Sequence, residues 1–217
     1  MIDGITRLPT TKRDNAFLVE EEDGYTLVDV GWAGAPKAIE AFLAERNRSL
    51  RDIRRIVITH AHPDHVKGLH ELRVRTGATV LIHSADAPWL QNGRVPAEGR
   101  SGGLGRFIDR LPLAHWTPVT ANGHVADGDM IGNLRVLHTP GHTPGHIALL
   151  HEPSRALLVG DLIFNRGTLG LGPPALAADP GRRPDSIAKL PKDVSAIGLA
   201  HGDPLVGRQV ELIATIG

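Results

Sequence analysis

The stretch His60-Ala61-His62-Pro63-Asp64-His65 places four side chains that can bind a metal ion within six residues. It follows residues 53–59, a run rich in β-branched side chains that predicts a strand. A strand that ends in such a cluster carries its polar side chains to the edge of a sheet, where a site can open to solvent. In extended chain His60 and His62 leave the same side and can bind one ion. Three imidazoles and a carboxylate suit zinc best, with iron or manganese as alternatives.

Three later segments each bring one more candidate ligand after a short apolar run. His142 ends Thr139-Pro140-Gly141-His142, Asp161 follows Gly160, and His201 begins His201-Gly202-Asp203-Pro204. The apolar runs before them, at 134–138, 156–159 and 197–200, predict strands. The sequence therefore predicts a metal site built at several strand ends, rather than a run of surface histidines.

Taken in order, these segments resemble the motif of the metallo-β-lactamase superfamily, from near the N-terminus to about residue 205. The resemblance implies an α/β fold, a four-layer αββα sandwich with two metals at one edge of its two sheets. We expect residues 1–217 to form one such domain. The implied ligands are His60, His62 and His142 for the first metal and Asp64, His65 and His201 for the second, with Asp161 bridging both. The expected cofactors are two zinc ions, with iron or manganese as alternatives.

The resemblance also implies a reaction, hydrolysis by a hydroxide that bridges the metals, with no covalent enzyme intermediate. Two ions about 3.5–4 Å apart can lower the pKa of a shared water to about 7. Asp64 would be the catalytic residue, because it would hold the second metal and orient the hydroxide. Asp29 matches a position where this superfamily places an acceptor for the far nitrogen of a ligand histidine. A turn aspartate at the end of a strand is the alternative for Asp29, and for His146 we favour a supporting role over direct ligation.

The differences between this sequence and other branches of the superfamily narrow the range of expected activities. The chain has no cysteine, which the commonest β-lactamase subclass uses as a ligand, and its Asp161 is missing from another subclass. The segment Gly160-Asp161-Leu162-Ile163-Phe164 looks like that of glyoxalase-II-type thioesterases, whereas similar acyl-homoserine lactonases carry a proton-donating tyrosine where Phe164 stands. A departing alkoxide gains about 10²–10⁴-fold from a positioned acid, whereas a thiolate needs none. We therefore predict a thioester substrate.

Three alternatives stay open. The first is a lactonase, or another ester or phosphodiester hydrolase of the same fold. The second is a persulfide dioxygenase, which resembles glyoxalase II but holds one iron by two histidines and one aspartate. The third is a non-catalytic metal-binding scaffold. Because the full ligand set is present, we favour two metals over the dioxygenase and an active enzyme over the scaffold.

Composition limits the partners. The 24 basic and 24 acidic residues cancel, so no net positive field favours nucleic acid, and we expect a small-molecule substrate. No apolar run approaches the roughly 20 residues that span a bilayer. Met1-Ile2-Asp3-Gly4 lacks the features of a secretory signal. We expect a cytoplasmic homodimer without a membrane partner.

The order of apolar segments predicts alternating strands and helices. We expect strands at 5–8, 16–21, 24–30, 53–59, 79–82, 134–138, 147–151 and 155–159, and helices at 36–47, 65–75, from 186 and from 208. The strands at 147–151 and 155–159 read as a hairpin. Glycine and proline interrupt residues 84–115 and 165–184, which we expect to be irregular loops that shape specificity. We expect the first of them to border the active site and to contain a helical turn at 106–110.

Overall fold

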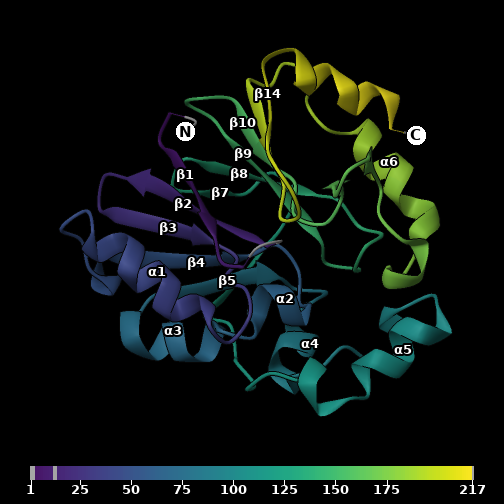
Figure 1. Ribbon diagram of the computed structural model, residues 1–217, viewed down its shortest axis with the longest axis horizontal. Helices are drawn as coiled ribbons and strands as arrows, with labels where there is room; N and C mark the ends of the chain where they lie inside the picture. The colour runs from purple at the N-terminus through teal and green to yellow at the C-terminus, as the bar shows by residue number, and fades with distance from the viewer. Residues whose placement is uncertain (1–2, 12–13, 217) are drawn as a thin grey trace.

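The computed structural model, which describes residues 3–11 and 14–216, contains two six-stranded sheets that pack face to face (Figure 1). The first has the order β1-β2-β3-β4-β5-β6. Its strands are β1 Ile5–Pro9, β2 Asn15–Glu21, β3 Gly24–Val28, β4 Ile53–Ile58, β5 Thr79–His83 and β6 Gly123–Val125. The pairs β1–β2 and β2–β3 are antiparallel, and β3 to β6 run parallel.

The second sheet has the order β14-β13-β10-β9-β8-β7. Its strands are β7 Met130–Ile131, β8 Leu134–His138, β9 Ile147–His151, β10 Ala156–Leu158, β13 Ala196–Gly198 and β14 Leu205–Val206. Only β10 and β13 pair in parallel within the described sheet. The predicted hairpin is confirmed, because β9 and β10 are antiparallel neighbours with His151 opposite Ala156. A small separate hairpin joins β11 (Phe164–Asn165) to β12 (Leu169–Gly170).

Helices cover the outer face of each sheet, which completes the predicted four layers (Figure 1). On the first sheet lie α1 (Ala35–Ala44) and α3 (Leu69–Thr76). On the second lie α6 (Arg183–Ala188) and the C-terminal 3-10 helix Gly207–Thr215. None of the described helices is long and apolar enough to cross a bilayer.

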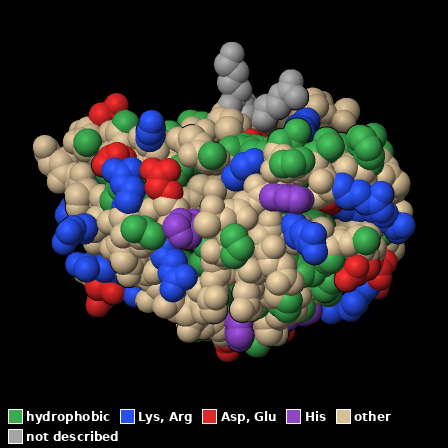
Figure 2. All heavy atoms as spheres, turned by 90° about the horizontal axis from the view of Figure 1, so that it is seen from below, with side chains coloured by type: hydrophobic (Ala, Val, Ile, Leu, Met, Phe, Trp, Pro, Cys, Tyr) green, Lys and Arg blue, Asp and Glu red, His purple; other side chains and the backbone are tan. Residues whose placement is uncertain are grey.

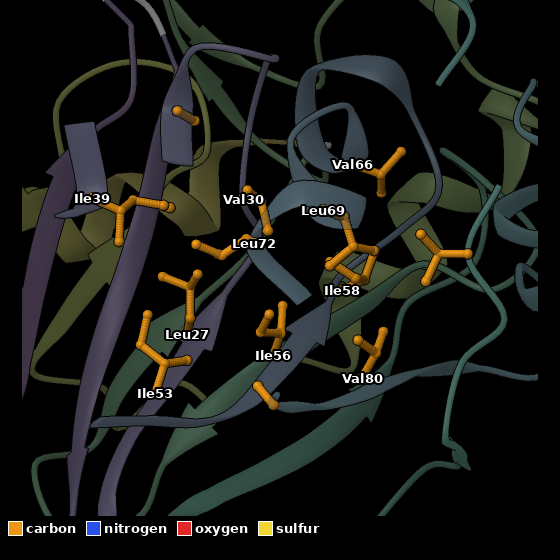
Figure 3. Packing of buried hydrophobic residues seen from close by; sticks show 14 of the residues in the cluster. Leu27, Val30, Ile39, Ile53, Ile56, Ile58, Val66, Leu69, Leu72 and Val80 are labelled. Carbon is orange, nitrogen blue, oxygen red and sulfur yellow. The ribbon is translucent and has the colours of Figure 1, made fainter. Parts of the chain in front are cut away.

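The strand β4 shows how one stretch of sequence serves two layers. Its alternate side chains Ile56 and Ile58 pack with Leu69 and Leu72 of α3, as Figure 3 shows, whereas Val57 packs between the sheets. All five side chains are fully buried. Each such burial contributes about 1.5–3 kcal/mol relative to exposure. The loop after β4, which carries His60 to His65, is therefore anchored from both sides.

The predicted helix over residues 65–75 is wrong in its bounds, because the chain forms two shorter helices there. The first, α2, spans Pro63–Val66, and α3 begins at Leu69. The break falls at Gly68, where the backbone lies against the loop before α1. A Cβ at Gly68 would lie only 3.0 Å from the carbonyl oxygen of Trp32 in that loop, and 2.8 Å from Cδ of Pro36 in the first turn of α1. Proline is favoured in the first turn of a helix, so Pro63 starts α2 and turns Asp64 and His65 back toward the sheet edge.

Residues 84–115 are more regular than the sequence suggests. They contain α4 (Ala87–Asn92) and α5 (Gly103–Asp109), with 3-10 turns at Ala97–Gly99 and Pro112–Ala114. Two of the residues that suggested an irregular loop instead bound a helix. Pro88 lies in the first turn of α4, and Gly93 ends it with φ of +69°. Residues 165–184 likewise contain 3-10 turns at Pro174–Leu176 and Pro180–Arg182.

Candidate metal centre

The seven predicted ligands come together at the edge where β4, β8, β10 and β13 end. One group consists of His60, His62 and His142, and the other of Asp64, His65, Asp161 and His201. Within each group the candidate ligand atoms all lie within 4.8 Å of one another. The two groups match the two sets that the sequence predicts, and they form two adjacent candidate metal sites.

Asp161 lies between the two groups and turns one carboxylate oxygen toward each. Its Oδ2 is 3.3 Å from Nε2 of His142 and 3.9 Å from Nε2 of His60. Its Oδ1 is 3.2 Å from Nε2 of His65 and 3.1 Å from Nε2 of His201. This geometry suits the bridging role that the resemblance implies for Asp161.

The centre is closed on most sides and open at Asp64. The imidazoles of both groups are at most 2% exposed, whereas the Asp64 side chain is 26% exposed. Asp64 Oδ2 lies 3.3 Å from Nε2 of His201, so it belongs to the second group and also faces solvent. A substrate would therefore approach on the Asp64 side.

Buried polar atoms without a hydrogen bond test whether a metal fits. Five of them gather here: Nε2 of His60, Nε2 of His62, Nε2 of His65, Nδ1 of His142 and Oδ1 of Asp161. Leaving a buried polar atom unpaired costs about 1–3 kcal/mol, so five in one place indicate a ligand for them. Imidazole nitrogens and carboxylate oxygens are donors that zinc prefers. The residues present fit a two-metal centre.

Burial and neighbouring charges set the ionisation of these groups. Burial, and then the charges of nearby histidines, hold the pKa of His60 well below its ordinary value, so its imidazole is neutral, the form that binds metals. Burial alone would raise the pKa of Asp161, but His201 and His65 hold it well below its usual range. The pKa of His201 is raised to about 12, since Asp161 and Asp14 outweigh its burial.

Asp29 supports two ligands at once. Its Oδ2 lies 2.9 Å from Nδ1 of His65 and accepts the Thr59 hydroxyl at 2.7 Å, while its Oδ1 accepts the Thr59 backbone N–H at 2.8 Å. The Thr59 hydroxyl in turn lies 3.1 Å from Nδ1 of His60. Asp29 adopts φ of +58°, which is uncommon for a residue other than glycine. These contacts fit the supporting acceptor better than an ordinary turn aspartate.

Sequence reasoning missed Asp14, which holds His201 in the same way. Its Oδ1 lies 2.9 Å from Nδ1 of His201, and its Oδ2 accepts the indole N–H of Trp32 at 3.0 Å. The neighbouring Asn15 fixes the same loop by donating to the carbonyls of Leu199 at 2.9 Å and Gly202 at 2.8 Å. No local pattern marks Asp14 in the sequence, because its partner lies in a distant segment.

His146 contacts the centre without belonging to either group, as favoured from the sequence. Its Nε2 accepts the backbone N–H of Asp161 at 3.0 Å, and its Nδ1 lies 2.8 Å from Oγ1 of Thr139. Burial lowers the pKa of His146 to about 3, so the ring is neutral and can accept at Nε2 while donating from Nδ1. His146 therefore fixes the backbone of Asp161.

A third supporting acid, Asp86, connects two of the loops that carry ligands. It accepts the backbone N–H of Ala61 at 3.0 Å, the hydroxyl of Thr143 at 2.7 Å and the backbone N–H of Gly145 at 2.7 Å. Ala61 lies between the first two histidines, and Thr143 follows His142. Asp86 therefore sets the spacing of the first group, although nothing near it in the sequence suggests that role.

We call residues 84–115 the flap, and hydrogen bonds connect it to the metal centre. Arg100 forms an ion pair with Asp109 at 2.7 Å and donates to the carbonyl of Leu176 at 2.6 Å. The backbone N–H of Ser101 donates to Ala177 at 2.7 Å. The N–H of Ala178 then donates to the carbonyl of His142 at 2.9 Å. The flap is thus hydrogen-bonded to residues 174–178, and these are hydrogen-bonded to the loop that carries His142.

Comparisons with known proteins agree with this geometry. A family model described as the metallo-beta-lactamase superfamily matches residues 10–202. YobT of Bacillus subtilis (strain 168), an uncharacterized protein, is 31% identical over 77% of this chain and 69% of its own length. The probable metallo-hydrolase YflN of the same organism is 26% identical over 92% of this chain and 84% of its own length.

Two proteins named hydroxyacylglutathione hydrolase also match. The one from Rhodopseudomonas palustris (strain BisA53) is 35% identical over 61% of this chain. The one from Cereibacter sphaeroides (strain ATCC 17029 / ATH 2.4.9) is 34% identical over 75% of this chain. The chain spans 42% and 53% of their lengths, respectively, so it matches only part of each.

Solved structures share the fold. BJP-1, a subclass B3 metallo-beta-lactamase of Bradyrhizobium japonicum, superposes with a TM-score of 0.72 at 25% identity, over 92% of this chain and 75% of that one. The MIM-2 metallo-beta-lactamase reaches 0.73 at 22% identity, over 99% and 78%. The predicted αββα architecture is confirmed.

Proposed function

The chain belongs to the metallo-beta-lactamase superfamily as a metal-dependent hydrolase with a two-metal His/Asp site, and we propose that it hydrolyses a small-molecule thioester. The observation that carries the choice of a thioester is the position of Phe164. The proposed metal is zinc, because imidazole and carboxylate donors in this arrangement suit it best.

The ring of Phe164 lies beside one proposed ligand of each metal group. Its ring stacks parallel to that of His201, with 5.1 Å between ring centroids and 5° between planes, and lies 6.2 Å from the ring of His142. It offers no hydroxyl to a departing oxygen. The single tyrosine of the chain, Tyr25, is on β3 and packs against the core beneath α1 and α3.

This arrangement favours a leaving group that needs no proton. A thiol has a pKa near 8.5, so a thiolate can depart unprotonated at neutral pH. An alkoxide is far more basic, and losing a positioned acid would slow its departure by about 10²–10⁴-fold. A thioester therefore suits this site better than a lactone. The names of the two matched hydroxyacylglutathione hydrolases also favour a thioester.

The residues divide the work as follows. Two bound ions would supply an activated water and polarise the thioester carbonyl. Asp161 would hold both ions, since each of its oxygens faces one group. Asp64 would be the catalytic residue, because its carboxylate belongs to the second group and is partly exposed, so it could orient a water for attack on the substrate. His201 would help to hold the second ion, and Asp29 would orient His65, another proposed ligand of that ion.

Other expectations remain predictions: a small-molecule substrate without nucleic acid or membrane partners, a homodimer and a cytoplasmic location. Among the alternatives, a mononuclear iron dioxygenase would need only one group, whereas two complete groups lie side by side here. A non-catalytic scaffold has no use for the solvent-facing Asp64.

A matched pair of substrates tests the proposed function. The zinc-loaded protein would be given S-lactoylglutathione, another thioester with a different thiol, and oxygen esters of the same acyl groups. We expect kcat/KM for a thioester to exceed that for its oxygen ester by at least about 100-fold, the lower end of what a missing acid costs. Equal rates, or faster lactone hydrolysis, would reject the thioester assignment.

A further inference from the structure

A cavity of about 410 Å³ lies within the flap, between α4 and α5, away from the proposed metal ligands. Its volume falls in the range of small-molecule sites, about 300–1,000 Å³. Arg94, Arg106, Arg110 and His115 line it, with Trp89 at one wall, and we call it the arginine cavity. On the right-hand side of Figure 2, where α5 lies, Lys and Arg side chains are exposed together with hydrophobic and acidic ones.

The positive charge of this cavity is not compensated from within. In the described part of the chain, the side chains of Arg94 and Arg110 form no hydrogen bond or ion pair. Arg106 donates through Nε to the carbonyl of Arg100 at 2.8 Å. Its two terminal nitrogens form no hydrogen bond within the described part of the chain. The acidic residue of the lining, Asp109, already holds Arg100 through contacts of 2.7 and 3.3 Å.

The arginine cavity adjoins the metal centre through one side chain. The indole of Trp89 forms part of the cavity wall. The same ring lies beside the imidazole of His62, with 6.2 Å between ring centroids and 29° between planes. Trp89 therefore links the wall of the arginine cavity to a proposed ligand of the first metal.

We propose that the arginine cavity binds an anionic group, a carboxylate or a phosphate, of the thioester substrate. Guanidinium groups present paired N–H donors that match the oxygens of both anions, and they stay charged at all working pH values. That the substrate is a thioester rests on the proposed function. The preference of the cavity for an anion can be measured independently.

Kinetics with matched thioesters test the proposal and separate the two anions. The S-acetyl derivatives of N-acetylcysteine and of its methyl ester differ by one carboxylate. S-Acetylpantetheine and its 4′-phosphate differ by one phosphate. Each pair would be assayed with the zinc-loaded wild type, with Arg94→Ala/Arg110→Ala, and with the control Arg51→Ala, which removes an exposed arginine from the turn Leu50–Asp52.

For the wild type we expect kcat/KM to be at least about tenfold higher on the anionic member of one pair, through a lower KM. This is the size of effect that one charged hydrogen bond contributes. Arg94→Ala/Arg110→Ala should lose this preference and keep its rate on the neutral member, whereas Arg51→Ala should change neither. The pair that shows the preference identifies the anion. A wild type that hydrolyses both members equally, or a double variant that keeps the preference, would overturn the proposal.

Failure of the proposed function leaves a different signature. If no thioester is hydrolysed, calorimetric titration of the zinc-loaded protein with succinate and with inorganic phosphate replaces the kinetics. Binding at the metals would survive in Arg94→Ala/Arg110→Ala, so the difference between wild type and variant reports the cavity alone. A loss of at least about tenfold in affinity supports the anion site, and equal affinities reject it.

Discussion

Oδ1 of Asp14 lies 2.9 Å from Nδ1 of His201, and Oδ2 of Asp29 lies 2.9 Å from Nδ1 of His65. Two ligands of the second group are therefore each oriented by a carboxylate from the β1–β2 loop or the end of β3. Such contacts fix the tautomer of the imidazole and increase its basicity. The second metal site depends on the N-terminal part of the chain as well as on the ligand loops.

We predict that Asp14→Ala lowers the affinity for the second metal by about 10–100-fold, the usual effect of removing an outer hydrogen-bond partner of a ligand histidine. The first metal should bind as before, because Asp14 contacts none of its ligands. Competition with a zinc-binding dye, together with the zinc content per chain, would measure both sites. The control Asp14→Asn keeps one acceptor oxygen and should lose less. Unchanged metal affinity at both sites would show that Asp14 does not support the second metal site.

Removing a proposed ligand should abolish hydrolysis and leave a folded protein. For Asp64→Ala or His142→Ala we expect turnover to fall by more than about 100-fold, beyond the losses seen for outer partners. Circular dichroism would check the fold, and the assay would be run at saturating zinc. A variant that keeps over half of wild-type turnover would refute its assignment.

Much of this centre could be predicted because each ligand is local to a recognisable strand end. His60, His142, Asp161 and His201 each follow an apolar run within a few residues. The four layers were predicted from the resemblance to the superfamily, and the structure shows that alternate side chains of β4 pack on its two faces. A local sequence pattern is enough to predict a ligand when the ligand directly follows the strand that positions it.

The supporting residues could not be found in this way. Asp14 and Asp86 act on loops far away in the sequence, and nothing beside them marks their partners. In the flap, the helical turn predicted at 106–110 overlaps α5, whereas α4 was missed for another reason. Proline and glycine can interrupt a helix or bound it, and only the packed chain shows that Pro88 and Gly93 do the latter.

The ion pair between Arg100 and Asp109 should control the order of the flap. Both side chains are less than 10% exposed, so Arg100→Ala would leave a buried carboxylate without its cation. Breaking such a pair costs about 3–5 kcal/mol, here as local opening. We predict faster hydrogen exchange in residues 94–115 and 174–177, and a higher KM.

A double variant, Arg100→Leu/Asp109→Leu, is the control, because it removes both charges. It should recover most of the lost protection, since replacing a buried pair by apolar groups is often neutral. If Arg100→Ala exchanges like the wild type, the flap is held by its backbone hydrogen bonds to residues 175–177 alone.

Acidification should destabilise the fold through a histidine pair outside the metal centre. The rings of His83 and His138 stack with 4.1 Å between centroids and 8° between planes. Burial, and then the neighbouring His138, lower the pKa of His83 below its ordinary value. The folded state thus binds fewer protons than the unfolded state, so this contribution to stability is present above about pH 6.5 and is lost as the pH falls below it.

We predict that the melting temperature falls between about pH 7.5 and about pH 5.5, and falls less in His83→Gln, which has no charge to gain. Scanning calorimetry at both pH values would measure the two differences. An identical fall in wild type and variant would show that other groups account for the whole effect.

The most direct test of the central claim is a zinc titration of the metal-stripped protein, with S-lactoylglutathione hydrolysis measured at each step. We predict no activity after chelation and a rise that levels off at two zinc ions per chain, the number of candidate sites. Full hydrolysis with one ion or none, or oxygen uptake that requires iron, would contradict a two-metal thioesterase.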